Sequence, residues 1–299
     1  MSQKHRRTAW SLLAVSFALA ATAAVSAAQH SCRVAGEAVN LQGLNEASGI
    51  AVSRRTAGIL WSHNDSGEPA LIAVSADGTT RGRVYVSGGD GDWEDVAVGP
   101  CPQGSCVYIG DIGDNDGRRR EVFIYRMPEP DTGANVSVRA ESMRLTYPDG
   151  PRDAEAMVVM SDGTLFIVSK GEAGAVALYR VPKPFENGAR AQLERVTTLV
   201  EPAGGSTGRV ARRSRVTGAG SSPDGRWVVL RTLDTIAFYE AETFSAGNPR
   251  VAFRFDVSGA GERQGEGVAI GDDGTVWLAS EGGGNNRPGT IARLECTLK

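Results

Sequence analysis

A short sequence pattern recurs five times along this chain of 299 residues, and it limits the folds open to the chain. In each copy a polar or acidic start is followed by small and then mostly apolar residues. The copies are ASGIAVS (47–53), WEDVAVG (93–99), AEAMVVM (154–160), VTGAGSS (216–222) and GEGVAIG (265–271). Further short apolar runs follow each copy, several of them after an Asp-Gly turn, and such runs are typical of β-strands. Tandem units of four antiparallel strands predict an all-β fold, a β-propeller.

The spacing of the pattern gives the number of blades. Its second position falls on Ser48, Glu94, Glu155, Thr217 and Glu266, at intervals of 46, 61, 62 and 49 residues. The residues after Glu266 and those between residue 28 and Ser48 together supply about one more blade. We therefore expect five blades, with residues 33–41 forming the outer strand of the last blade and closing the ring.

The chain has four cysteines, Cys32, Cys101, Cys106 and Cys296. Cys101 and Cys106 flank a short turn, which favours a local disulfide and leaves Cys32 to pair with Cys296 at the other end of the ring. Buried free thiols are the alternative. A zinc site is not expected, because the chain has three histidines and no Cys-x-x-Cys motif.

Residues 1–28 have the pattern of an export signal, with Lys4, Arg6 and Arg7 before an apolar run at 10–25 and small residues at 26–28. We expect a periplasmic or secreted protein, with the export route, Sec or twin-arginine, left open. Residues 29–299 should form one domain without a membrane span. The net charge of −3 gives no sign of a nucleic-acid-binding face, and we expect a monomer.

Inner strands of a propeller line its axis, so the five pattern positions should form a ring of polar side chains. Glu94, Glu155 and Glu266 would repel one another there unless a cation or raised pKa values neutralised them. Oxygen ligands that include several carboxylates suit calcium, so Ser48, Glu94, Glu155, Thr217 and Glu266 are candidate calcium ligands. The alternative is that these groups bind only water and neighbouring backbone groups.

The order Ser, Glu, Glu, Thr, Glu, together with WEDVAVG and the stretch VYIGDIGDN at 107–115, resembles the calcium-activated nucleotidase (apyrase) family. This resemblance implies a five-bladed propeller with a central calcium held by the five ring residues, Thr217 standing where the family has Ser. The chain is also similar to bacterial exported phytase-like and esterase-like propellers. The likeness covers the blade pattern and not the nucleotide-binding residues.

Ends of the second strands should surround the mouth of the channel on the face where the first strands begin. The candidate catalytic residues there are His63, Asp65, Asp111, Lys170 and Glu281, and the candidate substrate-binding residues are Arg215, Arg231, Asp114 and Asn115. Several of the acidic and amide side chains could instead close turns on their own backbone, His63 could pack beside the channel, and Lys170 could only neutralise Glu155.

These residues favour a hydrolase of phosphate esters or anhydrides that acts on a small or phosphorylated ligand above the calcium. Two alternatives remain at this point. One is a non-catalytic propeller that binds a ligand or a protein around a structural calcium, since a fold does not define an activity. The other is a glycoside or lactone hydrolase.

Overall fold

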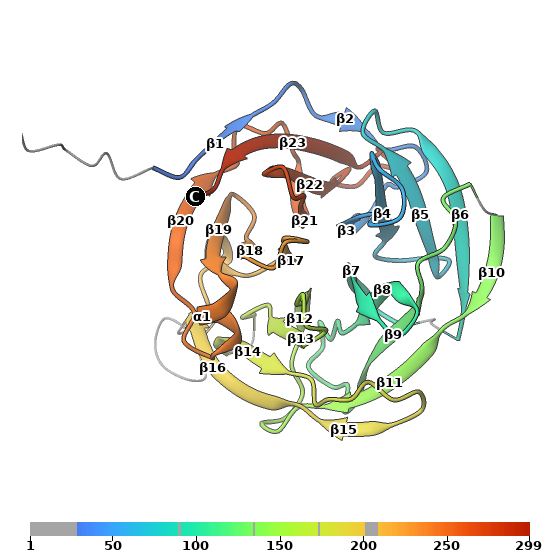
Figure 1. Ribbon diagram of the computed structural model, residues 1–299, viewed down its shortest axis with the longest axis vertical. Helices are drawn as coiled ribbons and strands as arrows, with labels where there is room; N and C mark the ends of the chain where they lie inside the picture. The colour runs from blue at the N-terminus through green and yellow to red at the C-terminus, as the bar shows by residue number, and fades with distance from the viewer. Residues whose placement is uncertain (1–28, 89–90, 134, 173, 201–208) are drawn as a thin grey trace, which may run out of the picture.

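The computed structural model describes residues 29–88, 91–133, 135–172, 174–200 and 209–299. Five β-sheets stand around a central axis like the blades of a propeller, which confirms the predicted fold class (Figure 1). The predicted export signal, residues 1–28, lies outside the described residues. In the part of the chain that is described, no helix is both long and apolar enough to cross a membrane.

The first two blades have five strands each. From the axis outward, the first contains β3 (Ala47–Val52), β4 (Ile59–Asn64), β5 (Ala70–Ser75), β6 (Thr80–Ser87) and β10 (Asn135–Arg139). The second contains β7 (Trp93–Cys101), β8 (Gly104–Asp111), β9 (Val122–Pro128), β11 (Glu141–Thr146) and β15 (Arg190–Gln192).

The remaining blades follow the four-strand plan more closely. The third contains β12 (Ala154–Val159), β13 (Leu165–Ser169), β14 (Val176–Arg180) and β16 (Glu194–Val200). The fourth contains β17 (Gly218–Ser221), β18 (Trp227–Arg231), β19 (Thr235–Glu240) and β20 (Val251–Asp256). The fifth contains β21 (Gln264–Ile270), β22 (Thr275–Glu281), β23 (Thr290–Thr297), β1 (Ser31–Val34) and β2 (Val39–Asn40). A short helix α1 (Ala241–Ser245) and a 3₁₀ turn η1 (Arg212–Ser214) complete the described elements.

The strict four-stranded antiparallel blade expected from the sequence needs one correction. Strand β10 pairs in parallel with β6 of the first blade, and β15 pairs in parallel with β11 of the second. Both added strands come from connections within the following blade. An outer strand exposes unpaired N–H and C=O groups, and these long connections supply partners for them.

The ring closes as predicted, with the two ends of the described chain in one blade. Strands β1 and β2 both pair antiparallel with β23, divided by a turn at Gly36, whose φ is +86°. Cys32 lies opposite Cys296 in this register and is bonded to it, and Cys101 is bonded to Cys106. Both expected disulfides are confirmed, and such bonds are typical of proteins that mature in an oxidising compartment.

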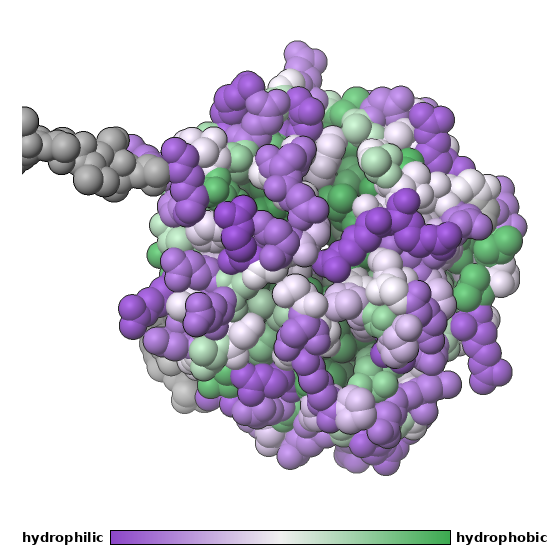
Figure 2. Space-filling view, in the orientation of Figure 1, coloured by the Kyte–Doolittle hydropathy of each residue, from purple (hydrophilic) through white to green (hydrophobic). Residues whose placement is uncertain are grey.

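Apolar side chains fill the spaces between neighbouring blades. Trp61 and Trp93 share one cluster with β5, β8 and β9, and Trp227 lies between the fourth and fifth blades. In the space-filling view hydrophilic side chains cover most of the visible face and hydrophobic ones form smaller patches (Figure 2). Because the core lies between the blades, the axis itself is free to carry polar groups.

Candidate functional site

The five predicted ring residues meet at one end of the axis. Ser48, Glu94, Glu155 and Glu266 lie near the starts of inner strands β3, β7, β12 and β21, and Thr217 immediately precedes β17. All five are between 4% and 8% exposed. They line one cavity of about 320 Å³. The structure thus brings together the side chains that the repeat spacing selects.

Irregular backbone pairing helps to aim these side chains at the axis. The register with the second strand shifts between Ala47 and Ile50, and between Trp93 and Asp95. It also shifts between Ala154 and Ala156, and between Gly265 and Val268. A β-bulge leaves an extra residue unpaired and turns its side chain. In four of the five blades the ring residue lies within the shifted segment.

The two hydroxyl groups of the ring link neighbouring inner strands. Ser48 Oγ donates a hydrogen bond to the backbone oxygen of Glu94 at 2.7 Å, and Thr217 Oγ1 donates to that of Glu266 at 3.2 Å. A hydroxyl that donates its hydrogen keeps its lone pairs, so both oxygens can still act as ligands. Gln264 Nε2 donates to Glu266 Oε1 at 2.9 Å and orients that carboxylate.

Burial and mutual repulsion make the ring carboxylates unusually basic. Burial, followed by the charge of Glu155, raises the pKa of Glu94 well above its ordinary value and that of Glu266 to about 8. Burial raises the pKa of Glu155 to about 7, although the nearby Lys170 ammonium opposes the shift. Within the described residues the Glu94 carboxylate has neither a hydrogen-bond donor nor an ion-pair partner.

The mouth of the same cavity contains five of the residues predicted to lie there: Asp65, Asn115, Lys170, Arg215 and Glu281. Four of them follow or end a second strand, as expected. Lys170 Nζ contacts Glu155 Oε1 and lies 3.5 Å from Asp153 Oδ2 and from Asn115 Oδ1. The ion pair with Glu155 corresponds to the alternative role considered for Lys170, and its ammonium is already engaged by acids.

A tighter acidic group lies beside the ring. Carboxylate oxygens of Asp65, Asp92 and Glu94 lie within 4.8 Å of one another. Burial and the charges of Asp92 and Glu46 raise the pKa of Asp65 to about 6. Glu94 belongs both to this trio and to the ring. The trio therefore adjoins the ring on the side of the first two blades.

Four residues that were predicted to lie at the mouth are not among the residues that line the cavity: His63, Asp111, Asp114 and Arg231. His63 is fully buried, accepts the N–H of Gly49 at Nε2 and faces the backbone oxygen of Asn64 at Nδ1. Burial lowers its pKa to about 4, so it is neutral near pH 7. Asp111 accepts a hydrogen bond from Arg119 at 2.6 Å and from the backbone N–H of Asp92.

Asp114 and Arg231 also have structural partners. The Asp114 carboxylate accepts the backbone N–H groups of Arg118 and Arg119, closing a turn. Arg231 is fully buried and donates to the backbone oxygens of Gly267 and Ala279 and, at 2.5 Å, to Glu262. Its guanidinium fits because Gly265 has no side chain: a Cβ there would lie 1.9 Å from Arg231 Nη2.

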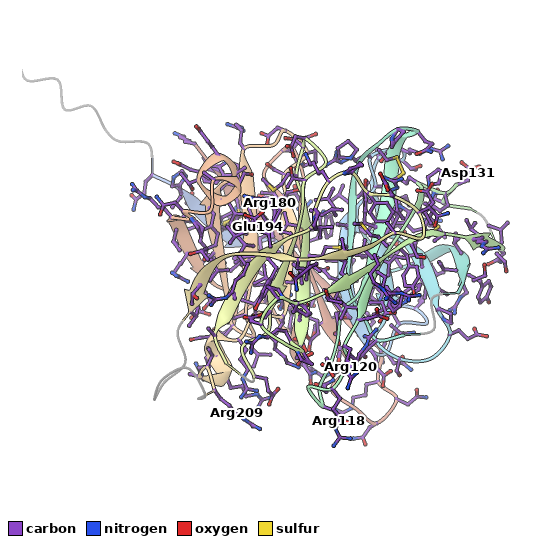
Figure 3. The ribbon with its side chains drawn as sticks, turned by 90° about the horizontal axis from the view of Figure 1, so that it is seen from below. Arg118, Arg120, Asp131, Arg180, Glu194 and Arg209 are labelled. Atoms are coloured by element: carbon purple, nitrogen blue, oxygen red, sulfur yellow. A yellow bond between two sulfur atoms is a disulfide. The ribbon has the colours of Figure 1, made fainter. Side chains whose placement is uncertain are left out.

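Further lining residues were not among the predicted site residues. They are Glu172, Arg212, Leu233 and Gln264. Glu172 forms an ion pair with Arg215 at 3.1 Å and another with the exposed Arg209. Arg209 lies with Arg118 and Arg120 at one face of the molecule, whereas Asp131 lies at the opposite face (Figure 3). Gln264 has the same repeat position as Arg215, two residues before a ring residue, and this position indicates a place near the rim.

Comparisons with known proteins extend the description of the fold. No protein-family model matches the sequence, and no curated protein matches it. The PQQ-bound aldose sugar dehydrogenase of Streptomyces coelicolor is 16% identical, with a TM-score of 0.52, over 90% of this chain and 99% of that one. A gluconolactonase of Xanthomonas campestris is 12% identical, with a TM-score of 0.49, over 86% and 74% of the two chains.

At 16% identity the match to the dehydrogenase, with its TM-score of 0.52, shows a shared fold and nothing finer. The propeller part of the resemblance noted in the sequence is confirmed by the five sheets around the axis. The nucleotidase part of that resemblance receives no support from this match.

Proposed function

We propose that this protein is a cation-dependent hydrolase of a small, neutral, hydroxyl-rich ester, such as a sugar lactone, and that it acts in the axial cavity. The charge of the cavity lining carries the proposal. Six carboxylates line it, those of Asp65, Glu94, Glu155, Glu172, Glu266 and Glu281, against the three cations Lys170, Arg212 and Arg215. A cleft lined mainly by one sign of charge repels ligands of that sign.

This balance disfavours the phosphate-ester hypothesis that the sequence suggested first. Arg231, expected to bind phosphate, is buried against backbone oxygens. Lys170 is paired with Glu155 and Arg215 with Glu172. A phosphate group would therefore meet an excess of carboxylates, whereas hydroxyl groups can donate hydrogen bonds to them.

The donor set fits a hard divalent cation, and we propose calcium. All candidate ligands are oxygens, and the charges of Glu155, Asp65, Asp92 and Asp153 all raise the pKa of the buried Glu94 carboxylate, which has no ion-pair partner within the described residues. An unpaired buried charge is costly, and calcium accepts six to eight such oxygens in flexible geometry. When bound, the cation would supply charge neutralisation and polarise a substrate carbonyl.

Asp65 is the residue best suited to act as a general base. It lies at the rim of the cavity, and its pKa of about 6 is close to the value at which a carboxylate works as a base near neutral pH. It would take a proton from water as the water oxygen bonds to the carbonyl carbon. The ring C–O bond then breaks, and the proton returns to the leaving alkoxide, giving the open hydroxy acid.

Lactone turnover tests the proposal. We expect calcium-dependent hydrolysis of aldonolactones above the spontaneous rate, and none of nucleotides or phytate. Asp65→Asn should lower kcat by about 10²- to 10⁴-fold. Asp162→Asn is the matched control, because Asp162 is an exposed turn residue paired with Lys183. Phosphate release without lactone turnover would restore the phosphate-ester hypothesis, and no turnover of either class would favour a binding protein.

A further inference from the structure

The residue that follows each ring position shows a sharp contrast among the blades. These residues are Gly49, Asp95, Ala156, Gly218 and Gly267. Neighbouring inner strands come so close that a Cβ on Gly49 would lie 2.5 Å from the backbone N of Val96. On Gly218 and Gly267 it would lie 2.4 Å from the backbone oxygens of Glu266 and Ser48. Four of these five residues are thus Gly or Ala, and Asp95 is the only one of the five with a polar side chain.

The Asp95 carboxylate joins three inner strands. It is fully buried. Its Oδ1 accepts the backbone N–H of Val96 at 2.9 Å, and its Oδ2 accepts those of Met157 at 2.8 Å and Ala219 at 3.4 Å. These are the N–H groups two residues after Glu94, Glu155 and Thr217 in the sequence. One carboxylate therefore ties together the backbones that carry three of the five ring residues.

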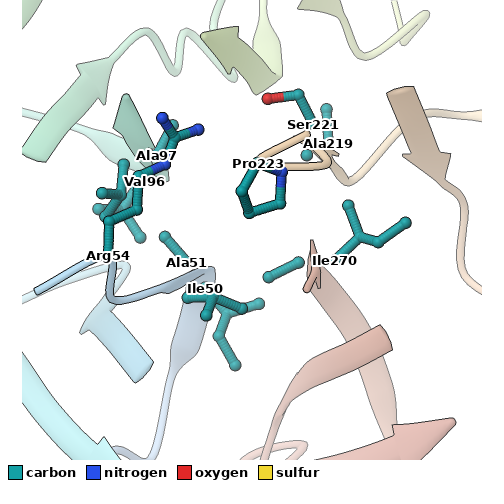
Figure 4. A pocket seen from close by; sticks show the side chains of 13 residues that line it. Ile50, Ala51, Arg54, Val96, Ala97, Ala219, Ser221, Pro223 and Ile270 are labelled. Atoms are coloured by element: carbon teal, nitrogen blue, oxygen red, sulfur yellow. The ribbon is translucent and has the colours of Figure 1, made fainter. Parts of the chain in front are cut away.

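Asp95 has only backbone N–H groups as hydrogen-bond donors within the described residues. On the side away from the ring, the axis opens into a small pocket formed mainly by apolar side chains of β3, β7, β17 and β21, including Ile50, Val96 and Ile270 (Figure 4). Within the described residues no side chain donates a hydrogen bond to Asp95. The hydrogen-bond partners of Asp95 are therefore backbone N–H groups of the inner strands.

We propose that Asp95 is a positioning residue that sets the spacing of Glu94, Glu155 and Thr217, and thereby the size selectivity of the axial cation site. This inference rests on the cation site of the proposed function. Selectivity between calcium and magnesium depends on cavity size and on the rigidity of the ligands. Groups that orient metal ligands without touching the metal have large effects on metal binding.

The test is the effect of Asp95→Asn on the affinities for calcium and magnesium, measured by calorimetric titration. An amide nitrogen in place of one carboxylate oxygen would face an N–H donor and release at least one strand. We expect calcium affinity to fall about 10- to 100-fold, the preference for calcium over magnesium to shrink, and bound terbium to hold more water, as read from its luminescence lifetime in H₂O and D₂O.

Leu278→Ala is the control, because Leu278 is fully buried in the core between two blades and is not among the residues that line the cavity. It should lower stability without changing the ratio of the two affinities or the terbium hydration. If Asp95→Asn does not fold, Asp95→Glu keeps the charge, displaces the carboxylate by one methylene and should change the same two readouts. The inference is overturned if a folded Asp95 variant keeps the cation selectivity and the terbium hydration of the wild type. If the wild type itself binds no cation, the proposed function is overturned and the inference with it.

Discussion

Glu155 and Glu266 are held close to protonation at neutral pH by their burial and by their neighbours. Their pKa values of about 7 and 8 exceed the ordinary value of 4.5, which also applies to the unfolded chain. Groups with a raised folded-state pKa contribute stability that is complete below the unfolded value and lost as the pH rises through the folded one. When these side chains ionise, their negative charges repel one another in the cavity, and a bound cation would reduce this repulsion.

This repulsion predicts a pH-dependent stability. Without divalent cations the melting temperature should fall between about pH 5 and about pH 9. Saturating calcium should remove most of that fall, because it stabilises the ionised carboxylates. Differential scanning calorimetry with calcium and with chelator measures both curves. The Glu266→Gln variant should give a flatter cation-free curve, and an equal slope in variant and wild type would contradict the assignment to Glu266.

Lys170 provides a second prediction for a single residue. Lys170→Met leaves the buried Glu155 carboxylate without its cation. We expect the cation-free protein to lose about 1–3 kcal/mol of stability, and calcium to bind more tightly because a competing positive charge is gone. Urea unfolding and calorimetric titration measure the two effects. Lys183→Met is the matched control, since Lys183 pairs with Asp162 on the exposed surface, and the prediction fails if both variants behave alike.

The ring residues were predictable because a repeat reports equivalent positions directly. The direction in which a side chain points at the end of a strand was not predictable in the same way. Arg231 and Lys170 both end second strands in the pattern, yet Lys170 lines the cavity and Arg231 does not. The space that admits the Arg231 guanidinium comes from Gly265 on the next blade, and no local sequence signal connects the two positions.

Among the elements, the inner strands depend on unusually close packing at the axis. Gly49 shows this most clearly, because its N–H also donates to His63 Nε2. The number of blades and the closing strand followed from the spacing of the repeat. Strands β10 and β15 were missed because each pairs with the outer edge of another blade, which is a long-range choice that their own short sequences do not signal.

Gly49→Ala tests the close packing. The new Cβ would lie 2.5 Å from the Val96 nitrogen and 2.8 Å from the Asp95 Cα, and backbone atoms cannot move aside cheaply. We expect a loss of about 1–3 kcal/mol in the free energy of unfolding, as for other overpacked sites. Gly259→Ala is the control, because nothing lies within 4 Å of a Cβ there. Equal urea midpoints for the two variants would refute the close approach.

For the whole molecule, the ring is closed by pairing β1 and β2 with β23 and by the disulfide between Cys32 and Cys296. The bonded cysteines are 264 residues apart, whereas Cys101 and Cys106 are separated by 5. In the chain-entropy model a disulfide that closes a longer loop restricts the unfolded chain more. The closing disulfide therefore acts on the entire propeller, and the other on a single hairpin.

Removal of each disulfide should give different results. Replacing both Cys32 and Cys296 by Ser should cost about 2–5 kcal/mol, measured by urea unfolding. Replacing Cys101 and Cys106 by Ser should cost clearly less and serves as the comparison. A larger loss from the local pair would contradict the view that ring closure is the main contribution.

The central claim is that five inner strands build one cation site at the axis. Calorimetric titration of calcium into chelator-treated protein, with Glu94→Gln alongside the wild type, tests it most directly. The account predicts saturable binding of calcium to the wild type and a loss of affinity of at least about tenfold in Glu94→Gln. Absence of binding to the folded wild-type protein, or equal affinity in the variant, would contradict it.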